Sequence, residues 1–262
     1  MAFARTNGIV LHYETRGAAE APALVFSNSL GTDFRIWDQV ADKLADDFRL
    51  ILYDKRGHGL SDAPPQPYRM EEHVEDLASL LKHLNVSSAV VAGLSVGGMI
   101  AQGLAYAHPE LVRALVLCST APKVGTEAMW NDRINAINNG GFSSMAEAIL
   151  SRWFAPSYRS PENPDFMGYA NMLVRTPPDG YAGTCAAIRD ADFTSAVRRL
   201  HLPVLCLVGD EDCSTPPELV RELASLIPGA HFTIVEGAGH ILCVEQPEAI
   251  AKLIREFVTS LA

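Results

Sequence analysis

One stretch constrains the fold of this chain more than any other: Gly93-Leu94-Ser95-Val96-Gly97. It follows the apolar residues 90–92 and precedes residues 99–105, whose composition is typical of a helix. A serine between two glycines at a strand-to-helix turn is the pattern of a nucleophile elbow, whose sharp turn needs residues without side chains nearby. The N–H groups that begin the helix point toward negative charge developing beside the serine oxygen. The pattern predicts a nucleophilic Ser95, and an ordinary glycine turn is the alternative.

Composition limits the kind of protein and the partners it could have. The chain has 262 residues, 48% hydrophobic and 20% charged, which is typical of a globular protein with a sizeable core. This length suits one large α/β domain or two small ones. The net charge of −10 argues against nucleic acid or an anionic membrane as a partner, because both select basic surfaces. A small anionic substrate remains compatible, since one or two arginines suffice to bind it.

Cysteine usage and the absence of long apolar runs bear on the compartment. The five cysteines are odd in number, form no C-x-x-C pair and mostly lie in apolar runs (Cys118, Cys185, Cys206, Cys213 and Cys243). This usage suits a reducing cytosol. The first residues lack the apolar core of a signal peptide, and no apolar run approaches membrane-spanning length. We therefore expect a soluble, cytoplasmic protein, whose oligomeric state the sequence does not indicate.

Short apolar segments alternate with helical patterns along much of the chain. Asn7-Gly8 predicts a two-residue hairpin turn between two N-terminal strands. Buried strands are then predicted at residues 23–26, 48–53, 90–92, 114–118, 204–209 and 232–235, and helices at 37–44, 70–84, 99–105, 217–226 and 247–261. Most of these strands are apolar on both faces, which is typical of a parallel sheet covered by helices on both sides.

The alternation is interrupted in the middle of the chain. Residues 123–192 contain no apolar strand, only helix-like pieces separated by Asn-Gly, Pro and Gly clusters. A segment of this length is too long to be a plain loop. We therefore predict an α/β core formed by residues 1–122 and 193–262, with residues 123–192 as a helical cap that lies over the sheet.

Candidate partners for Ser95 follow two late strands. A serine nucleophile needs a base that takes its proton and an acid that orients the base. Ligands of such sheets bind at the carboxyl ends of the strands, and Asp212 and His240 each follow a predicted strand there. The chain order Ser95, Asp212, His240 is also the order of the catalytic triad known for this kind of sheet.

Neighbouring residues offer alternatives for the base and the acid. Asp210 directly abuts its strand, where capping the turn is the alternative role, and Glu211 is adjacent. His58, in a Gly-His-Gly loop, is interpreted as a structural residue that bonds backbone beneath the site. His240 stands just past a late strand and behind two nearby glycines, so we favour it as the base and Asp212 as the acid.

Acyl transfer also requires an oxyanion hole of two backbone donors. One expected donor is the N–H of Val96, directly after the nucleophile, and the other is the N–H of Leu30, in the loop after the strand at 23–26. The sequence has no His-Glu-x-x-His motif, no spaced Cys/His set and no dinucleotide-binding loop. We therefore expect neither a metal nor a cofactor.

The elbow, the triad order and the helical insertion together resemble the α/β-hydrolase superfamily over essentially the full chain. This resemblance implies an α/β-hydrolase fold, with a mostly parallel central sheet, helices on both faces and a helical cap insertion. More narrowly, the sequence resembles the 3-oxoadipate enol-lactonases of bacterial aromatic degradation. The matching segments are residues 27–33 with Trp37, residues 53–59, and the cap segments 130–134, 152–154 and 180–192.

The cap segments are the most telling part of this resemblance, because caps vary most between hydrolase subfamilies. Segment 180–192, which begins Gly-Tyr-Ala-Gly-Thr-Cys, is the longest of them. Two residues depart from the enol-lactonase pattern: Lys55, where Thr is usual, and Val96, where Met is usual. Neither departure removes a catalytic group, although Val96 could reshape the acyl pocket.

The resemblance implies a small anionic lactone as substrate, a five-membered enol-lactone with an acetate arm. It further implies that Ser95 attacks the lactone carbonyl, that His240 is the base and that Asp212 holds the imidazole. Water would then release 3-oxoadipate from the acyl-enzyme.

The acetate arm of this substrate needs a cation inside the cap. Arg133 beside Trp130 and Arg152 beside Trp153 are the candidates, worth about 1–3 kcal/mol for a bidentate contact. For each arginine the alternative is a solvated helix face. For the two tryptophans the alternative to substrate binding is packing within the cap.

Other activities are compatible with the same triad. A carboxylesterase, a carbon–carbon bond hydrolase and a cofactor-free perhydrolase would share it. Only the cap segments distinguish these activities, and they favour the lactonase. A non-catalytic ligand-binding protein of the same fold is the alternative of another class. Such proteins usually lose a triad member, whereas all three candidates are present here.

Overall fold

The computed structural model describes residues 1–261, which fold around an eight-stranded sheet of order β1-β2-β4-β3-β5-β6-β7-β8. Strands β1 and β2, and strands β2 and β4, pair antiparallel, and every other neighbouring pair is parallel. The strands are β1 (Ala2–Thr6), β2 (Ile9–Arg16), β3 (Ala23–Ser27), β4 (Arg49–Tyr53), β5 (Ala89–Leu94), β6 (Val112–Cys118), β7 (Val204–Gly209) and β8 (His231–Val235).

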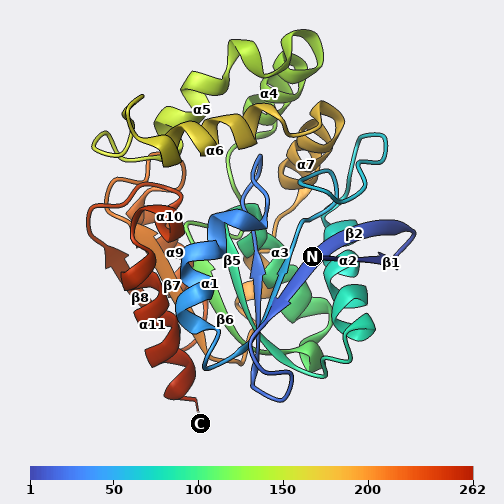
Figure 1. Ribbon diagram of the computed structural model, residues 1–262, viewed down its shortest axis with the longest axis vertical. Coiled ribbons are helices and arrows are strands. Elements are labelled where there is room, and N and C mark those ends of the chain that lie inside the picture. The colour runs from blue at the N-terminus through green and yellow to red at the C-terminus, as the bar shows by residue number, and fades with distance from the viewer. Residues whose placement is uncertain (262) are drawn as a thin grey trace.

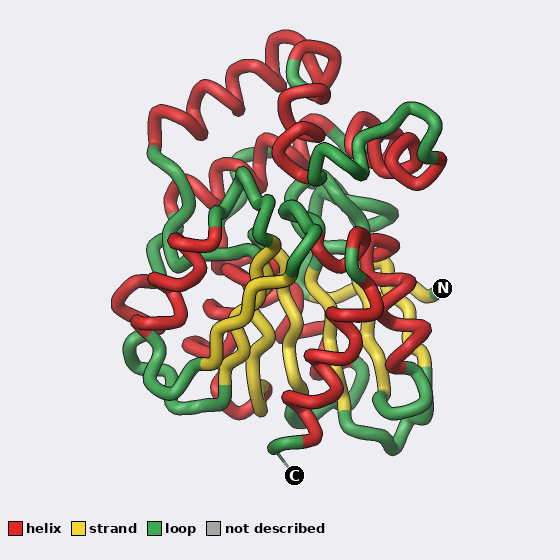
Figure 2. The backbone as a smooth tube through the Cα atoms, turned by 90° about the vertical axis from the view of Figure 1, so that its left-hand side faces the viewer, coloured by secondary structure: helices red, strands yellow, loops and turns green. Residues whose placement is uncertain are grey.

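Helices cover both faces of this sheet, as Figure 2 shows. Helix α1 packs against α11, and α2 packs against α3. The helices outside the segment between β6 and β7 are η1 (Phe34–Trp37), α1 (Asp38–Leu44), α2 (Met70–His83), α3 (Val96–Ala107), η2 (Pro109–Leu111), α9 (Pro217–Leu226), α10 (Leu242–Glu245) and α11 (Pro247–Thr259). The mostly parallel α/β-hydrolase fold that the sequence predicts is confirmed.

Local sequence explains where the strands and turns form. Strands β5 and β7 are buried along their whole length, as expected for apolar strands with helices on both faces. Thr6 pairs with Ile9 across the hairpin, so Asn7-Gly8 forms the predicted two-residue turn. Both turn residues have positive φ, 47° and 81°, which Asn and Gly tolerate best.

Element boundaries differ slightly from the predicted ones. The helix expected at residues 37–44 begins as the 3-10 helix η1 and continues as α1, and the Asp33 side chain caps η1 by accepting the N–H of Arg35 at 3.1 Å. The strand expected at 114–118 begins earlier, at Val112, and the last helix ends at Thr259. Apolar periodicity predicts the buried part of an element better than its ends.

The segment between β6 and β7 contains helices and no strand within the described residues. These helices are α4 (Glu127–Gly140), η3 (Gly141–Ser144), α5 (Ala146–Trp153), α6 (Pro164–Val174), α7 (Pro178–Asp190) and α8 (Thr194–Val197). In Figure 1, helices α4, α5 and α6 lie above the carboxyl ends of the parallel strands, and α4 packs closely on α7. We propose residues 123–192 as a cap on a core of residues 1–122 and 193–262.

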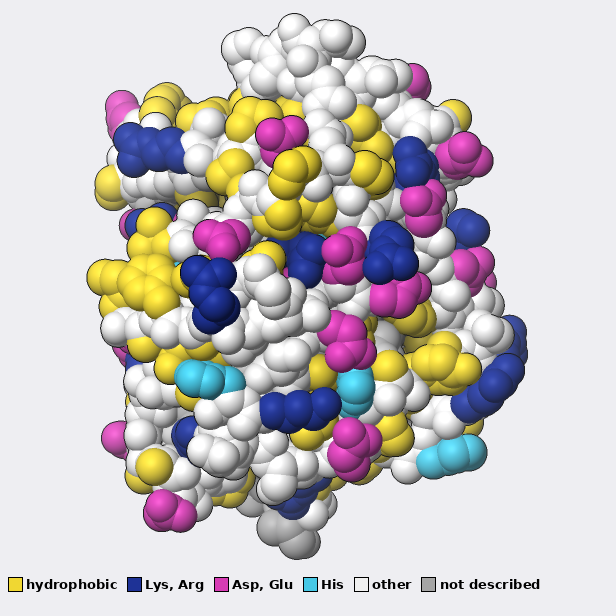
Figure 3. Space-filling view, turned by 90° about the vertical axis from the view of Figure 1, so that its right-hand side faces the viewer, with side chains coloured by type: hydrophobic (Ala, Val, Ile, Leu, Met, Phe, Trp, Pro, Cys, Tyr) yellow, Lys and Arg dark blue, Asp and Glu magenta, His cyan; other side chains and the backbone are white. Residues whose placement is uncertain are grey.

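The surface carries charges of both signs. On the face shown in Figure 3, Lys and Arg side chains stand among Asp and Glu side chains, with hydrophobic side chains between them. Some charged side chains of the molecule pair directly: Arg16 contacts Glu14 at 2.7 Å and Asp38 at 2.6 Å. Among residues 1–261, no helix combines the length and the apolar character needed to cross a membrane.

Candidate active site

Ser95 lies at the turn from β5 into α3, in a strained backbone conformation. Its φ is 58° and its ψ is −119°, a region that costs a non-glycine residue about 1–3 kcal/mol. Hydrogen bonds from outside the turn hold it there: the Ser95 N–H donates to the Cys118 carbonyl at 2.9 Å, and the Thr120 hydroxyl donates to the Ser95 carbonyl at 2.7 Å. The sharp turn expected at Ser95 is therefore present, and β6 and the residues after it stabilise it.

The two glycines that flank the turn are required by space. A Cβ atom on Gly93 would lie 2.3 Å from the Gly97 carbonyl oxygen, and one on Gly97 would lie 2.2 Å from the Ser27 carbonyl oxygen. Both distances are far shorter than van der Waals contact. The glycines thus let the first turn of α3 approach β5 and the end of β3, where the predicted oxyanion loop begins.

His240 and Asp212 are in direct contact. Nδ1 of His240 is 3.0 Å from Oδ2 and 3.1 Å from Oδ1 of Asp212, and both side chains are buried. With the carboxylate against Nδ1, we assign the proton of the neutral imidazole to that nitrogen, which leaves Nε2 as an acceptor. The predicted base and its predicted orienting acid therefore have suitable geometry.

The surroundings of Asp212 favour its ionised form. Its Oδ1 accepts the N–H groups of Ser214 at 2.8 Å and Thr215 at 2.9 Å, and its Oδ2 accepts the Thr215 hydroxyl at 2.9 Å. Burial by itself would raise the pKa of Asp212, but the interaction with the adjacent His240 and these hydrogen bonds outweigh it and hold the pKa below its usual value. Asp210 instead accepts the Ala238 N–H at 3.2 Å, which is the turn-capping alternative.

Ser95 and His240 line one pocket of about 110 Å³ beneath the cap. The other predicted site residues that line it are Leu30, Val96, Trp130, Arg133, Arg152 and Trp153. Asp212 does not line the pocket, because it lies behind the imidazole. Within residues 1–261 no hydrogen bond joins the Ser95 hydroxyl to His240, and such contacts often tighten only when substrate binds.

The loop that carries Leu30 is held by side chains of the loop after β4. The Gly31 N–H donates to Nε2 of His58 at 2.9 Å, and Nδ1 of His58 lies 3.1 Å from the Arg56 carbonyl oxygen. Burial lowers the pKa of His58 well below its usual value, so the ring is neutral and Nε2 can accept. The structural role predicted for His58 is thus confirmed. The Leu30 N–H itself donates to no acceptor within residues 1–261.

On the cap side, the two candidate arginines differ in exposure. Arg133 is half-buried, its guanidinium lies 5.3 Å from the ring centre of Trp130, and no ion pair involves it within the described chain. Arg152 is exposed at the edge of the pocket. Trp130 is buried and its indole N–H donates to the Val124 carbonyl at 2.7 Å. Arg133 is therefore better placed than Arg152 to meet an anion inside the pocket.

Trp153 connects the cap to the loop of the predicted base. Its side chain is buried and lines the pocket, while its carbonyl accepts the Ile241 N–H at 3.0 Å. Glu245 reinforces this junction, because its two oxygens accept the N–H groups of Ala155 at 2.9 Å and Gly239 at 2.8 Å. Burial raises the pKa of Glu245 to about 7.

Sequence reasoning missed two residues that contribute to the pocket. Tyr181 was part of a matching cap segment without an assigned role, but it is fully buried, lines the pocket, and its hydroxyl has no hydrogen-bond partner within the described residues. Thr215 holds the Asp212 carboxylate and its hydroxyl also lies 3.3 Å from Nδ1 of His240. A polar residue three positions after the predicted acid was the available signal for Thr215.

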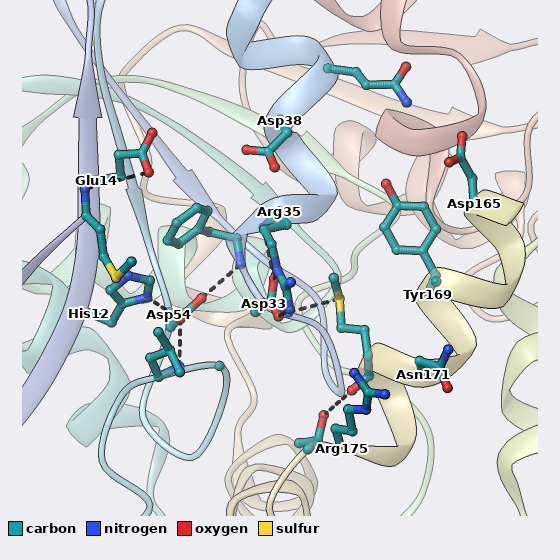
Figure 4. A pocket seen from close by; sticks show the side chains of 18 of the residues that line it. His12, Glu14, Asp33, Arg35, Asp38, Asp54, Asp165, Tyr169, Asn171 and Arg175 are labelled. Atoms are coloured by element: carbon teal, nitrogen blue, oxygen red, sulfur yellow. Dashed lines mark hydrogen bonds and ion pairs between the residues drawn. The ribbon is translucent and has the colours of Figure 1, made fainter.

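A larger hollow of about 980 Å³ lies between β2, η1 and α6, as Figure 4 shows. Its charged side chains pair largely with one another: His12 lies 2.7 Å from Asp54, and Arg35 lies 2.6 Å from Asp33. None of the predicted site residues lines it. Size alone would favour this hollow, but the convergence of Ser95 and His240 favours the smaller pocket as the candidate active site.

Comparison with known proteins agrees with this geometry. Residues 22–247 match the family described as alpha/beta hydrolase fold. Over 243 residues the chain is 35% identical to 3-oxoadipate enol-lactonase 2 of Acinetobacter baylyi, covering 92% of this chain and 90% of that protein. It is 30% identical to 3-oxoadipate enol-lactonase 1 of the same organism, covering 97% and 95% of the two chains.

A solved structure supports the same family assignment. The enol-lactonase from Burkholderia xenovorans superposes with a TM-score of 0.95 at 35% identity, over 98% of this chain and 100% of that one. The resemblance to 3-oxoadipate enol-lactonases expected from the sequence is thereby confirmed. By family match, sequence and architecture together, the chain belongs to the alpha/beta hydrolase fold family.

Proposed function

We propose that this protein hydrolyses 3-oxoadipate enol-lactone to 3-oxoadipate, a reaction of bacterial aromatic degradation through β-ketoadipate. The observation that carries the proposal is one pocket lined by Ser95, His240 and the half-buried Arg133. Such a pocket joins a hydrolytic centre to a cation that can bind the substrate's carboxylate. The likeness to proteins named enol-lactonases supports the same substrate class.

In the proposed acylation step, the Ser95 oxygen attacks the lactone carbonyl carbon while Nε2 of His240 takes its proton. The N–H groups of Leu30 and Val96 donate to the oxyanion of the tetrahedral intermediate. Collapse of this intermediate breaks the ring C–O bond and expels an enolate oxygen. The His240 imidazolium protonates that oxygen, and the resulting enol becomes a ketone.

In the proposed deacylation step, His240 takes a proton from water, whose oxygen attacks the acyl carbon. The second tetrahedral intermediate uses the same two N–H groups, and its collapse returns the proton to Ser95 and releases 3-oxoadipate. Asp212 stays ionised in both steps, because its pKa is held below the usual value, and it stabilises the imidazolium. The mechanism uses only protein groups and water.

We propose Arg133 as the residue that binds the acetate arm, with the buried Trp130 beneath it. An arginine–carboxylate pair in a partly dry pocket contributes about 1–3 kcal/mol. Exposed Arg152 would act earlier, by attracting the anion to the pocket mouth, where solvent weakens the interaction. Trp153 and Tyr181 would enclose the ring.

The test compares two substrates with the wild-type protein and the Ser95→Ala variant. Loss of enol-lactone is followed by ultraviolet absorbance, and p-nitrophenyl acetate hydrolysis is measured beside it. We expect a kcat/KM for the lactone at least about 100-fold above that for the ester, and neither activity in Ser95→Ala. Cleavage of the ester without the lactone would leave a carboxylesterase as the function, and no cleavage of either would leave a binding protein.

A further inference from the structure

Lys55, which has no part in the mechanism above, lies beneath the loop that carries the Leu30 N–H. Its side chain is only 1% exposed, which is rare for a lysine. Its ammonium group contacts two backbone carbonyls of that loop, donating to Ser29 at 2.5 Å and to Thr32 at 3.4 Å. A buried lysine whose nearest partners are carbonyls rather than carboxylates calls for a specific explanation.

The contact with Ser29 explains why a lysine is buried at this position, because the Ser29 carbonyl and the Leu30 N–H are the two ends of one planar peptide group. A donor on the carbonyl oxygen fixes the orientation of that plane. It also polarises the group, so that the N–H at the other end becomes a stronger donor. The Leu30 N–H has no acceptor within residues 1–261. Leu30 lines the pocket of Ser95, and its N–H is the second proposed oxyanion donor.

Further bonds hold the neighbouring atoms of the same loop. The Ser29 carbonyl also accepts the Thr32 N–H at 3.3 Å and the Thr32 hydroxyl at 2.9 Å. The next peptide group, between Leu30 and Gly31, is held at its N–H by His58. The two peptide groups around Leu30 are therefore each held by one side chain of the loop after β4, Lys55 on one and His58 on the other.

We propose that Lys55 is a positioning residue of the oxyanion hole, which holds the Ser29–Leu30 peptide group so that its N–H meets the substrate oxyanion. The inference rests on the proposed hydrolytic function of Ser95. It applies to any ester or lactone that enters the pocket, because each forms the same oxyanion. It also gives a role to a lysine at a position where the resembled lactonases usually have threonine.

The contact does not require Lys55 to be charged. Burial lowers the pKa of Lys55 well below its usual value, although Asp54 and Asp33 partly oppose this. A neutral amine still carries two N–H donors, enough for the two carbonyls of Ser29 and Thr32. The positioning role therefore holds in either protonation state.

The Lys55→Met variant tests the role, because it keeps the length of the side chain and removes its donors. We expect kcat to fall about 10- to 100-fold on both the enol-lactone and p-nitrophenyl acetate, with KM changed less than about threefold. The loss should be smaller than the 10²–10³-fold typical of removing an oxyanion donor, because the Leu30 N–H is misaligned rather than absent. Affinity for a boronic acid that forms a tetrahedral adduct with Ser95 should fall with kcat, whereas affinity for 3-oxoadipate should not.

Ser61→Ala is the matched control for a purely structural effect. The Ser61 hydroxyl is buried in the loop after β4, the loop that carries Lys55. It donates to the Asp54 carbonyl at 2.6 Å and accepts the His12 N–H at 2.9 Å, and it makes no hydrogen bond to the Ser29–Leu30 peptide group. We expect this variant to lose thermal stability while its kcat stays within twofold of wild type. A loss of kcat in Ser61→Ala equal to that in Lys55→Met would mean that general loosening of the loop, not positioning, explains the effect, and would overturn the proposal.

Thr32→Val provides a second route should Lys55→Met fail to fold. It removes the hydroxyl that donates to the same Ser29 oxygen and keeps the side-chain shape, so we expect a several-fold lower kcat with KM unchanged. A folded Lys55→Met protein, or in its absence Thr32→Val, with wild-type kcat would overturn the inference. Wild-type protein inactive on both substrates would instead overturn the proposed function.

Discussion

Two walls of the candidate pocket differ in their hydrogen bonds: the core wall, with Leu30, Ser95, Val96 and His240, and the cap wall, with Trp130, Arg133, Trp153 and Tyr181. On the core wall, buried hydrogen bonds hold each reacting group: Ser95 through Cys118 and Thr120, and Asp212 through the N–H groups that follow it. On the cap wall, two polar groups lack such partners: within the described residues, Arg133 has no ion pair and the Tyr181 hydroxyl has no hydrogen bond.

This difference indicates a division of labour. Groups that must stabilise a transition state work best when they are already oriented and need no rearrangement. Groups that select a substrate gain most when the substrate supplies the partner that they lack. We infer that the core wall determines the rate for any ester and that the cap wall determines which ester or lactone is accepted.

The largest expected effect is on the core wall, at Ser95. Replacement by alanine should lower kcat about 10⁴-fold or more on both lactone and ester, because it removes the proposed nucleophile of the acyl-enzyme. Binding of 3-oxoadipate, measured by calorimetry, should be unchanged, since the cap wall is intact. A fluorophosphonate should label wild type at one equivalent and leave Ser95→Ala unlabelled, and labelling of the variant would place the nucleophile elsewhere.

The next effect distinguishes two neighbouring acids behind the core wall, Asp212 and Asp210. Asp212→Asn should lower kcat about 10³- to 10⁴-fold, because an amide no longer favours the imidazole tautomer whose Nε2 accepts. Asp210→Asn is the matched control. Within residues 1–261 the Asp210 side chain accepts only the Ala238 N–H, so this variant should keep kcat within a few-fold of wild type. Equal losses in both variants would contradict the assignment of Asp212 as the orienting acid.

The core wall was largely predictable from the sequence, and the reason is local. Glycine spacing around Ser95 and apolar strands before Asp212 and His240 are encoded within a few residues of each site. The parallel sheet then brings the ends of these strands to one edge. The lysine at position 55, where the resembled lactonases usually have threonine, was also visible in the sequence. Its contact with Ser29, however, depends on how the loops after β3 and β4 meet.

The cap wall and its junction were less predictable, because they depend on contacts between distant segments. Glu245 bonds Ala155 across 90 positions of the chain, a pairing that no local pattern indicates. The sequence offered Arg133 and Arg152 as equal candidates, since helical spacing alone does not say which arginine the cap buries. Only packing separates the half-buried Arg133 from the exposed Arg152.

Substitutions on the cap wall should change KM rather than kcat. Arg133→Met removes the proposed carboxylate partner, so KM for the enol-lactone should rise roughly 10- to 100-fold, equivalent to about 1–3 kcal/mol. KM for p-nitrophenyl acetate, which has no carboxylate, should stay within twofold. Arg152→Met, the control at the exposed edge, should raise KM for the lactone less than about threefold. An unchanged KM in Arg133→Met would remove that residue from the binding role.

The smallest expected effect concerns Glu245, which joins the two walls. Its pKa of about 7 lies above the usual glutamate value of 4.5, so the unfolded chain loses the proton first as pH rises. The contribution of Glu245 to the free energy of unfolding is therefore full below pH 4.5 and is lost as pH rises through about 7, by on the order of 2 kcal/mol. Urea unfolding at pH 5 and pH 8 should show this loss in wild type and in the exposed control Glu248→Gln, but not in Glu245→Gln.

Because the buried His58 and His73 change stability in the opposite direction, the difference in pH dependence between the variants is the informative quantity. The same pH dependence in all three proteins would mean that the carboxyl at the junction of cap and core ionises freely, and that this junction is not sensitive to pH.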